Sequence, residues 1–173
     1  MKINLVEKSA QTSNNDVEII FVKSIDGLED IEILEILDFK AKDESCVLLA
    51  ESKKIYVGYE ENDYDSIAIA SATAIRKLQS TKFKNAKINL CEVLENNLKA
   101  LVEGALLGEY KFTDYKSDKE KRKIELELIV NENLKNININ TYAYPDKFIQ
   151  HGTEEELEKI YHQDAESIYK DIM

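Results

Sequence analysis

Histidines are the first side chains to consider for chemistry in this 173-residue chain, because a neutral imidazole is a common metal ligand and general base. His151 and His162 are the only two, and the stretch between them contains Glu154, Glu155 and Glu158. The His-Glu-x-x-His and Cys-x-x-Cys spacings of zinc sites are absent. We interpret the histidines as one residue near a helix start and one exposed residue, and we predict no metal site.

Serines and cysteines lack the neighbours that would make them nucleophiles. Ser13, Ser71 and Ser117 have no Gly-x-Ser-x-Gly context and no adjacent base, so a serine hydrolase is not supported. Cys46 and Cys91 each lie in an apolar, strand-like run with no second cysteine nearby. We expect both to be buried, reduced thiols, and we predict no catalytic residue.

Three glycines are the nearest approach to a phosphate-binding loop. Gly58 follows an apolar run, and Gly104 and Gly108 have the spacing Gly-x-x-x-Gly. A phosphate site needs backbone amides that face an anion, but Glu60 and Glu61 next to Gly58 would repel a diphosphate. We expect Gly104 and Gly108 to allow close helix packing and a helix end, and we predict no cofactor.

The charge of the chain limits its partners. There are 34 acidic and 23 basic residues, for a net charge of −11, whereas proteins that bind nucleic acid by phosphate contacts are basic. With 43% hydrophobic and 33% charged residues, the chain has the composition of a folded globular protein. No run approaches the roughly 18 apolar residues of a membrane span, and the start does not resemble a signal peptide. We predict a cytoplasmic protein that does not bind membranes, and the net charge disfavours nucleic acid as a partner.

Hydrophobic periodicity supplies the elements that would position these residues. Apolar and β-branched runs predict strands at residues 17–22, 46–50, 55–59, 86–91 and 124–130, the second and third forming a hairpin. Helical spacing of apolar residues predicts helices at residues 28–37, 64–79 and 96–108. Asp63 or Asp65 suits the start of the second helix. Strands that alternate with helices indicate an α/β fold, a three-layer α/β/α arrangement around a mixed sheet.

The chain changes character near Asn131, after which it is more acidic per residue. A strand-like run at 137–144 is followed by Thr153 and Glu156, which form a capping box ahead of a short helix. We predict a first domain at residues 1–131 and a strand-and-helix appendage at residues 132–173.

Three segments of the first domain carry a family resemblance: Ile55-Tyr-Val-Gly58, Ser71-Ala-Thr-Ala-Ile-Arg-Lys77, and residues 101–117, a glycine-bearing helix that ends in Tyr-x-Phe-x-x-Tyr-Lys. In this order they resemble the cytosolic leucyl aminopeptidase family. The likeness spans residues 1–131 and corresponds to that family's N-terminal domain, whose fold is similar to the macro domain.

The resemblance implies binding or assembly rather than catalysis. In that family the metal-binding carboxylates lie in a separate C-terminal domain, within a stretch that reads Asn-Thr-Asp-Ala-Glu-Gly-Arg, and this stretch is absent here. The N-terminal domain lies at the periphery of a hexamer that it helps to shape. We therefore expect a stand-alone, non-catalytic domain that associates with itself or with a separately encoded protein.

The same resemblance selects three glycines, and the residues themselves indicate a candidate interface. Gly58, Gly104 and Gly108 are structural positions of the family motif. Tyr110, Phe112 and Tyr115 form an aromatic patch beside Lys111 and Lys116 that could serve an interface. In the alternative interpretation these aromatic side chains fix the helix end to the sheet.

The appendage resembles a second family. Residues 144–152 read Tyr-Pro-Asp-Lys-Phe-Ile-Gln-His-Gly, and together with residues 154–157 and 164–168 they are similar to the C-terminus of deoxyxylulose phosphate synthase, over residues 141–170. In that family thiamine diphosphate is bound by earlier domains, which have no counterpart in this chain. The likeness therefore implies no catalysis.

Three alternatives remain open at the level of sequence. The chain could be part or a relic of a metal-dependent leucyl aminopeptidase that lacks its catalytic domain. It could be a macro-like binder of ADP-ribose or another nucleotide. It could also regulate DNA, as the corresponding domain does in some family members, although the net charge disfavours that role.

Overall fold

The computed structural model describes residues 1–7, 17–110 and 124–130. The chain divides into two compact units, Met1–Lys135 and Asn136–Met173, and the second lies wholly outside the described residues. The expectations for residues 137–173, including the capping box and the second resemblance, therefore lie outside the described part. The boundary at residue 131 stays a prediction.

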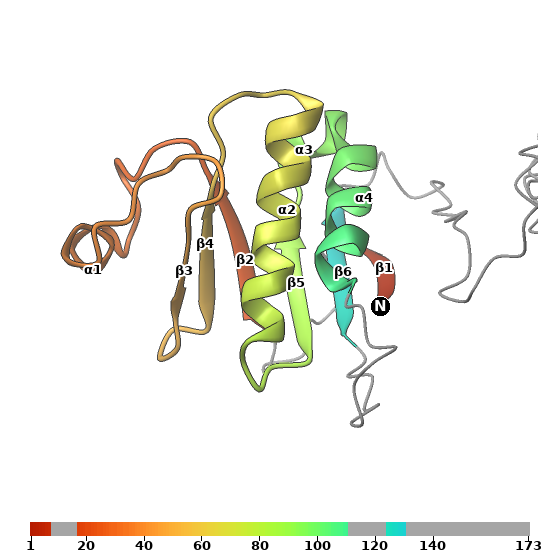
Figure 1. Ribbon diagram of the computed structural model, residues 1–173, viewed down its shortest axis with the longest axis horizontal. Helices are drawn as coiled ribbons and strands as arrows, with labels where there is room; N and C mark the ends of the chain where they lie inside the picture. Colours follow the sequence, from red (N-terminus) through yellow and green to blue (C-terminus); the bar gives the residue numbers. More distant parts are fainter. Residues whose placement is uncertain (8–16, 111–123, 131–173) are drawn as a thin grey trace, which may run out of the picture. The chain divides into compact units, whose positions relative to one another are not determined.

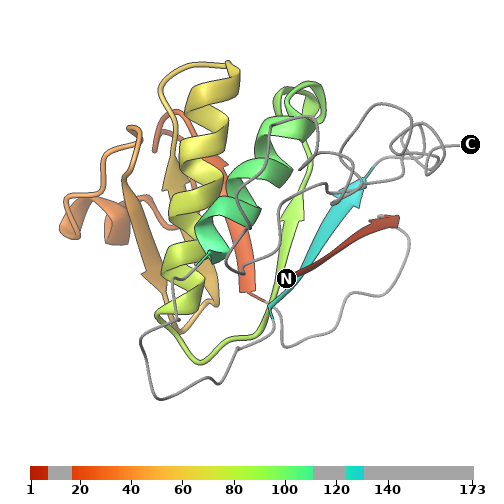
Figure 2. The same ribbon diagram turned by 45° about the vertical axis from the view of Figure 1, so that its right-hand side comes forward.

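The described residues build one six-stranded sheet in the order β1-β6-β5-β2-β4-β3 (Figure 1). Its strands are β1 (Lys2–Glu7), β2 (Val17–Val22), β3 (Cys46–Leu49), β4 (Lys54–Gly58), β5 (Asn85–Asn89) and β6 (Glu125–Val130). Neighbouring strands are parallel except for the antiparallel β3–β4 pair, which confirms the hairpin and the mixed sheet. Figure 2 shows β1 beside β6 at the edge opposite β3.

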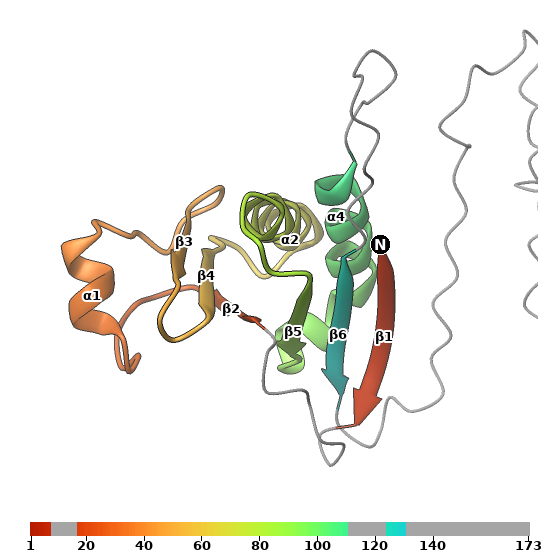
Figure 3. The same cartoon turned by 90° about the horizontal axis from the view of Figure 1, so that it is seen from below.

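Helices pack on both sides of this sheet. Helix α2 (Tyr64–Gln79) and helix α4 (Leu98–Glu109) lie side by side over one face, while α1 (Ile31–Ile36) lies on the other side of β3 and β4 (Figure 3). The helix expected at 96–108 is confirmed as α4, and the short α3 (Glu92–Asn96) that precedes it was not predicted. The α/β class is confirmed, and the likeness to the macro domain stays a prediction.

Burial follows the alternation of side chains along each strand. The face toward α2 carries a continuous layer of buried residues: Val17, Ile19, Ile55, Val57, Ala86, Ile88, Leu126 and Leu128. On the other face a second cluster joins α1 to the sheet through Val22, Leu34, Phe39, Leu49 and Tyr56. Two cores on opposite faces thus hold β4 and β2 between helices.

Helix α2 begins where the sequence predicts. Asp63 is its N-cap, and its carboxylate accepts a hydrogen bond of 2.9 Å from the Ser66 amide. Arg76 and Lys77 in the last turn suit the negative end of the helix dipole. Within the described residues, the helices are all too short or too polar to cross a membrane.

Candidate functional site

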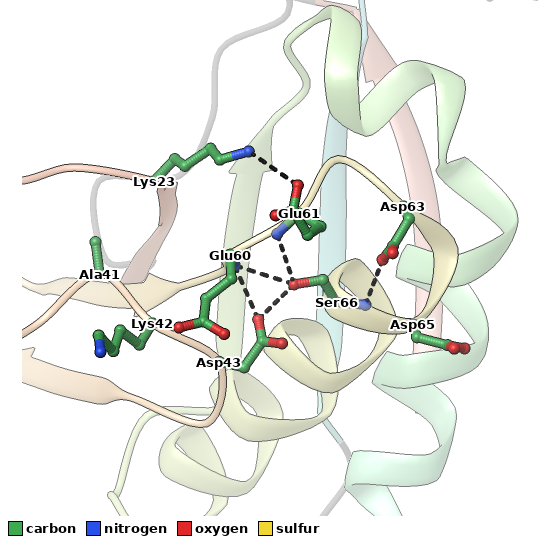
Figure 4. A pocket seen from close by; sticks show the side chains of 9 residues that line it. All are labelled: Lys23, Ala41, Lys42, Asp43, Glu60, Glu61, Asp63, Asp65 and Ser66. Atoms are coloured by element: carbon green, nitrogen blue, oxygen red, sulfur yellow. Dashed lines mark hydrogen bonds and ion pairs between the residues drawn. The ribbon is translucent and has the colours of Figure 1, made fainter.

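An open pocket of about 530 Å³ lies where β2 and β4 end (Figure 4). Lys23 directly follows β2, and Glu60 and Glu61 follow β4 after Tyr59. The first turn of α2 completes the wall, and the full lining is Lys23, Ala41, Lys42, Asp43, Glu60, Glu61, Asp63, Asp65 and Ser66. Carboxyl ends of parallel strands are the usual place for ligands in α/β sheets, so this pocket is the first candidate site.

A hydrogen-bond network built on Ser66 closes the inner wall of the pocket. The Ser66 hydroxyl accepts bonds from the amides of Glu60 (3.0 Å) and Glu61 (3.2 Å) and donates to the Asp43 carboxylate (Figure 4). The Glu60 amide also donates to Asp43 over 2.9 Å. Ser66 is only 4% exposed, and the three bonds that its hydroxyl makes are partly buried.

This network decides which charge the pocket accepts. Adjacent amides at a strand end can cradle a phosphate, but here the amides of Glu60 and Glu61 already bond to the chain's own hydroxyl and carboxylate. Five carboxylates line the pocket against two lysines, and Lys23 lies 3.6 Å from Glu61. The pocket therefore repels anions, as the glutamates after Gly58 led us to expect.

The acidic lining does not amount to a metal centre. Among residues 1–7, 17–110 and 124–130, no three His, Cys, Asp or Glu side chains are grouped so that they could hold a metal ion. His151 and His162 lie outside the described residues.

A second polar cluster links β4 to the start of α1. Asp30, at the N-cap of α1, accepts hydrogen bonds from the Tyr56 hydroxyl (2.7 Å) and from the Lys54 ammonium (2.9 Å), and Lys54 also contacts Glu29 (3.0 Å). The bond from Tyr56, followed by that from Lys54, lowers the pKa of Asp30. Bonds to Asp30 and Glu29 raise the pKa of Lys54. Burial, then the bond to Asp30, raises the pKa of Tyr56 to about 12, so its hydroxyl stays protonated and the cluster acts as a structural clamp.

Gly58 lies where β4 passes close to the loop before β3. A Cβ atom there would come within 2.4 Å of the Lys42 backbone and 2.5 Å of the Ser45 Oγ. The Gly58 amide donates to the Ser45 carbonyl over 3.0 Å. Gly58 therefore lets the segment that carries Asp43 approach the end of β4.

Gly104 and Gly108 lie on the side of α4 that faces α2. A Cβ at Gly104 would come within 2.2 Å of the Ala68 carbonyl oxygen, and one at Gly108 within 2.5 Å of the Ala72 carbonyl oxygen. The buried Ser71 hydroxyl donates to the Leu101 carbonyl over 2.6 Å at the same contact. The two helix backbones touch because glycines on α4 face alanines on α2, which confirms the close packing. The expected helix end at a glycine is wrong, because both glycines lie within α4 and its C-cap is Tyr110.

The predicted aromatic patch is described at one position. Tyr110 follows α4 directly and is 59% exposed. Phe112, Tyr115 and Lys116 lie outside the described residues, so their use at an interface stays a prediction.

An apolar groove runs over the outer surface of α2 and α4, with a volume of about 480 Å³. Its lining is Glu44, Ala68, Ile69, Ala72, Thr73, Arg76 and Leu107. Leu107 is 67% exposed and Ile69 is 37% exposed, so two large aliphatic side chains lie together at the surface of this groove. The groove is the second candidate site.

Local sequence patterns do not mark Asp43 or the Asp30–Lys54–Tyr56 cluster, and neither was predicted, because strand pairing brings their members together. Ser66 carried a usable signal, since it stands three residues after the capping Asp63. The prediction that Cys91 is buried is wrong. It lies beyond the end of β5 at the start of α3 and is exposed.

Comparisons with known proteins place these features in a family context. A model of the N-terminal domain of the cytosol aminopeptidase family matches residues 6–119. A probable cytosol aminopeptidase of Campylobacter jejuni is 29% identical over 139 residues, which cover 78% of this chain and 28% of that protein. One of Wolinella succinogenes is 33% identical over 108 residues, which cover 61% of this chain and 22% of that protein.

The chain thus spans about a quarter of the length of the curated relatives it matches. Among solved structures, the bottromycin maturation enzyme BotP is similar with a TM-score of 0.53 at 18% identity, over 66% of this chain and 27% of that one. This likeness shows a shared fold.

Proposed function

The chain belongs to the cytosol aminopeptidase family through its N-terminal domain, and from that premise we propose that it is a non-catalytic assembly domain that pairs with a second copy of itself. The match to the N-terminal domain supports the non-catalytic part of the proposal. The relatives are named cytosol aminopeptidases, which supports a cytoplasmic location.

The observation that carries the assembly role is the groove over α2 and α4. Leu107 lines the groove and is 67% exposed, so most of its side chain contributes no burial free energy in a monomer. Burying such a side chain contributes about 1.5–3 kcal/mol. Ala68 and Ala72 line the groove with small side chains that leave its space unfilled.

Charge at the groove favours a second copy as the occupant. Glu44 and Arg76 both line it, so one groove offers both signs of charge. In a two-fold pair each patch meets the same patch on the partner, and Arg76 of one copy can approach Glu44 of the other. The net charge of −11 opposes association in general, so we expect added salt to strengthen the pair.

Native mass by light scattering tests this proposal. We expect the wild-type chain to be a dimer, or a larger even assembly, in a concentration-dependent equilibrium. Leu107→Ser removes the same contact twice in a two-fold pair and should weaken association by about a hundredfold. Ile36→Ser, at an aliphatic position on α1 that is still more exposed (83%), is the control and should leave the mass unchanged.

A wild-type chain that stays monomeric at every concentration would overturn the assembly role. The non-catalytic part has its own assay. We expect no hydrolysis of leucine p-nitroanilide by the purified chain with added zinc, manganese or magnesium, and metal-dependent hydrolysis would contradict that part.

A further inference from the structure

Helix α1 exposes an unusual amount of aliphatic surface. Its one buried residue is Leu34, whereas Ile33 is 48%, Ile36 is 83% and Leu37, its C-cap, is 50% exposed. The spacing i, i+3, i+4 places these three side chains on one face of the helix. We call this set the α1 face.

Contacts with the sheet and with the segment after the helix fix the position of the α1 face. Leu34 packs in the cluster with Tyr56 and Leu49, and Asp30 at the N-cap bonds to Tyr56 and Lys54 of β4. After the helix, the Phe39 amide donates to the Leu34 carbonyl over 2.9 Å. A surface fixed in this way loses little conformational entropy on binding.

The rim of the α1 face is acidic. Lys54 pairs with Glu29 and Asp30, and Lys40 lies 3.6 Å from Asp38. Glu32 and Glu35 alternate with the exposed aliphatic residues, and no basic side chain within the described residues forms an ion pair with either. The carboxylates of Glu32 and Glu35 are therefore available to pair with basic side chains of a partner.

We propose that the α1 face binds a basic amphipathic helix of a separate protein. Aliphatic side chains at i, i+3 and i+4 of that helix pack on Ile33, Ile36 and Leu37, and its lysines or arginines lie opposite Glu32 and Glu35. A second copy of this chain is a poor occupant, because two α1 faces would bring carboxylates of the same sign together. This inference goes beyond self-association and uses a surface on the other side of the sheet from the groove (Figure 3).

Fluorescence anisotropy with the full chain tests the inference. The probe is a fluorescein-labelled helical peptide made of leucine and lysine, with its leucines at helical spacing. We expect Ile36→Ser to weaken binding at least about tenfold, which is the loss of one buried isoleucine contact. The double change Glu32→Gln and Glu35→Gln should weaken binding and reduce its dependence on salt.

Two controls make the result specific. Leu107→Ser, the matched aliphatic change on α4, should leave peptide binding unchanged. A lysine and serine peptide of equal charge should bind at least about tenfold more weakly than the leucine and lysine peptide, since it cannot fill the α1 face. Ile36 is 83% exposed, so Ile36→Ser should unfold in urea like the wild type, which checks that the variant is folded.

Three outcomes would overturn the inference: Ile36→Ser that binds the peptide like the wild type, equal binding of both peptides, or a native mass that falls in Ile36→Ser. The last would mean that the α1 face is an interface between copies. Because Leu107→Ser acts on mass and Ile36→Ser on peptide binding, failure of this inference is distinguishable from failure of the assembly role.

Discussion

The Tyr56 hydroxyl donates a 2.7 Å hydrogen bond to the Asp30 carboxylate and thereby joins the centre of β4 to the start of α1. Tyr56 is 2% exposed and belongs to the second core, and the Asp30 side chain that accepts the bond is 17% exposed. Lys54 completes the clamp from the same strand. The orientation of the α1 face therefore depends on a contact between residues far apart in sequence.

Tyr56→Phe should cost about 2 kcal/mol in the free energy of unfolding, because the hydrogen bond it removes ends on a charged, partly buried acceptor. Urea denaturation at neutral pH measures this. Tyr64→Phe is the control, since the Tyr64 hydroxyl bonds to Glu103 on the exposed surface and its loss should change stability by less than about 0.5 kcal/mol. Equal effects of the two changes would contradict the clamp.

The contribution of Asp30 should disappear in acid. Its pKa in the folded chain is lowered from 3.8, chiefly by the bond from Tyr56 and then by that from Lys54. Its stabilising effect is therefore complete above the unfolded pKa and is lost as pH falls through the lowered folded pKa. We expect the stability difference between wild type and Asp30→Asn to be constant near neutral pH and to shrink below pH 3.8. A difference that grows in acid would contradict the assignment.

Gly104→Ala should destabilise the contact between α2 and α4. The new Cβ would lie 2.2 Å from the Ala68 carbonyl oxygen, which is backbone and cannot rotate away. We expect a loss of about 2 kcal/mol or more from overpacking, despite a gain of up to about 1 kcal/mol in helix propensity. Thermal unfolding measures the net change in stability from these two opposing effects.

Gly27→Ala is the comparison for Gly104→Ala, because it introduces backbone strain without steric crowding. Gly27 has φ of +77° and no heavy atom within 4 Å of an added Cβ, so its replacement should cost only about 1–2 kcal/mol, from the left-handed backbone alone. If Gly104→Ala were as stable as the wild type, the two helices would not be in contact as described.

ADP-ribose should not bind the pocket at the ends of β2 and β4. The amides of Glu60 and Glu61 are already bonded to Ser66, and five carboxylates surround the space that a diphosphate would need. Titration calorimetry with millimolar ligand should detect no heat. Saturable heat that changes in Ser66→Ala would contradict this view of the pocket. It would favour the alternative that the chain binds ADP-ribose or another nucleotide.

The two cysteines should react at different rates. Burial raises the pKa of the Cys46 thiol to about 11, so little thiolate is present at neutral pH, whereas Cys91 is exposed. With a disulfide reagent such as DTNB we expect one fast and one slow thiol in the native chain. Cys91→Ser should abolish the fast phase, and loss of that phase in Cys46→Ser would reverse the assignment.

Local sequence determined much of the sheet and helices. The run Val17–Val22, the hairpin at residues 46–59 and the helix after Asp63 were predictable because β-branched runs, polar turns and capping residues act within a few positions. The family resemblance was predictable for a similar reason, since its motif lies in continuous segments. It is confirmed over residues 6–119.

The sites depended on tertiary structure. Asp43 meets Ser66, and Asp30 meets Tyr56, only because β4 pairs with both β2 and β3 and brings their flanking loops together. Cys91 was mistaken for a strand residue because the apolar pattern continues past the point where β5 ends. Helix α1 shows most clearly what the local sequence could not determine. Its periodicity revealed a helix, but the side that faces the sheet was decided by packing against β4, which left Ile36 exposed.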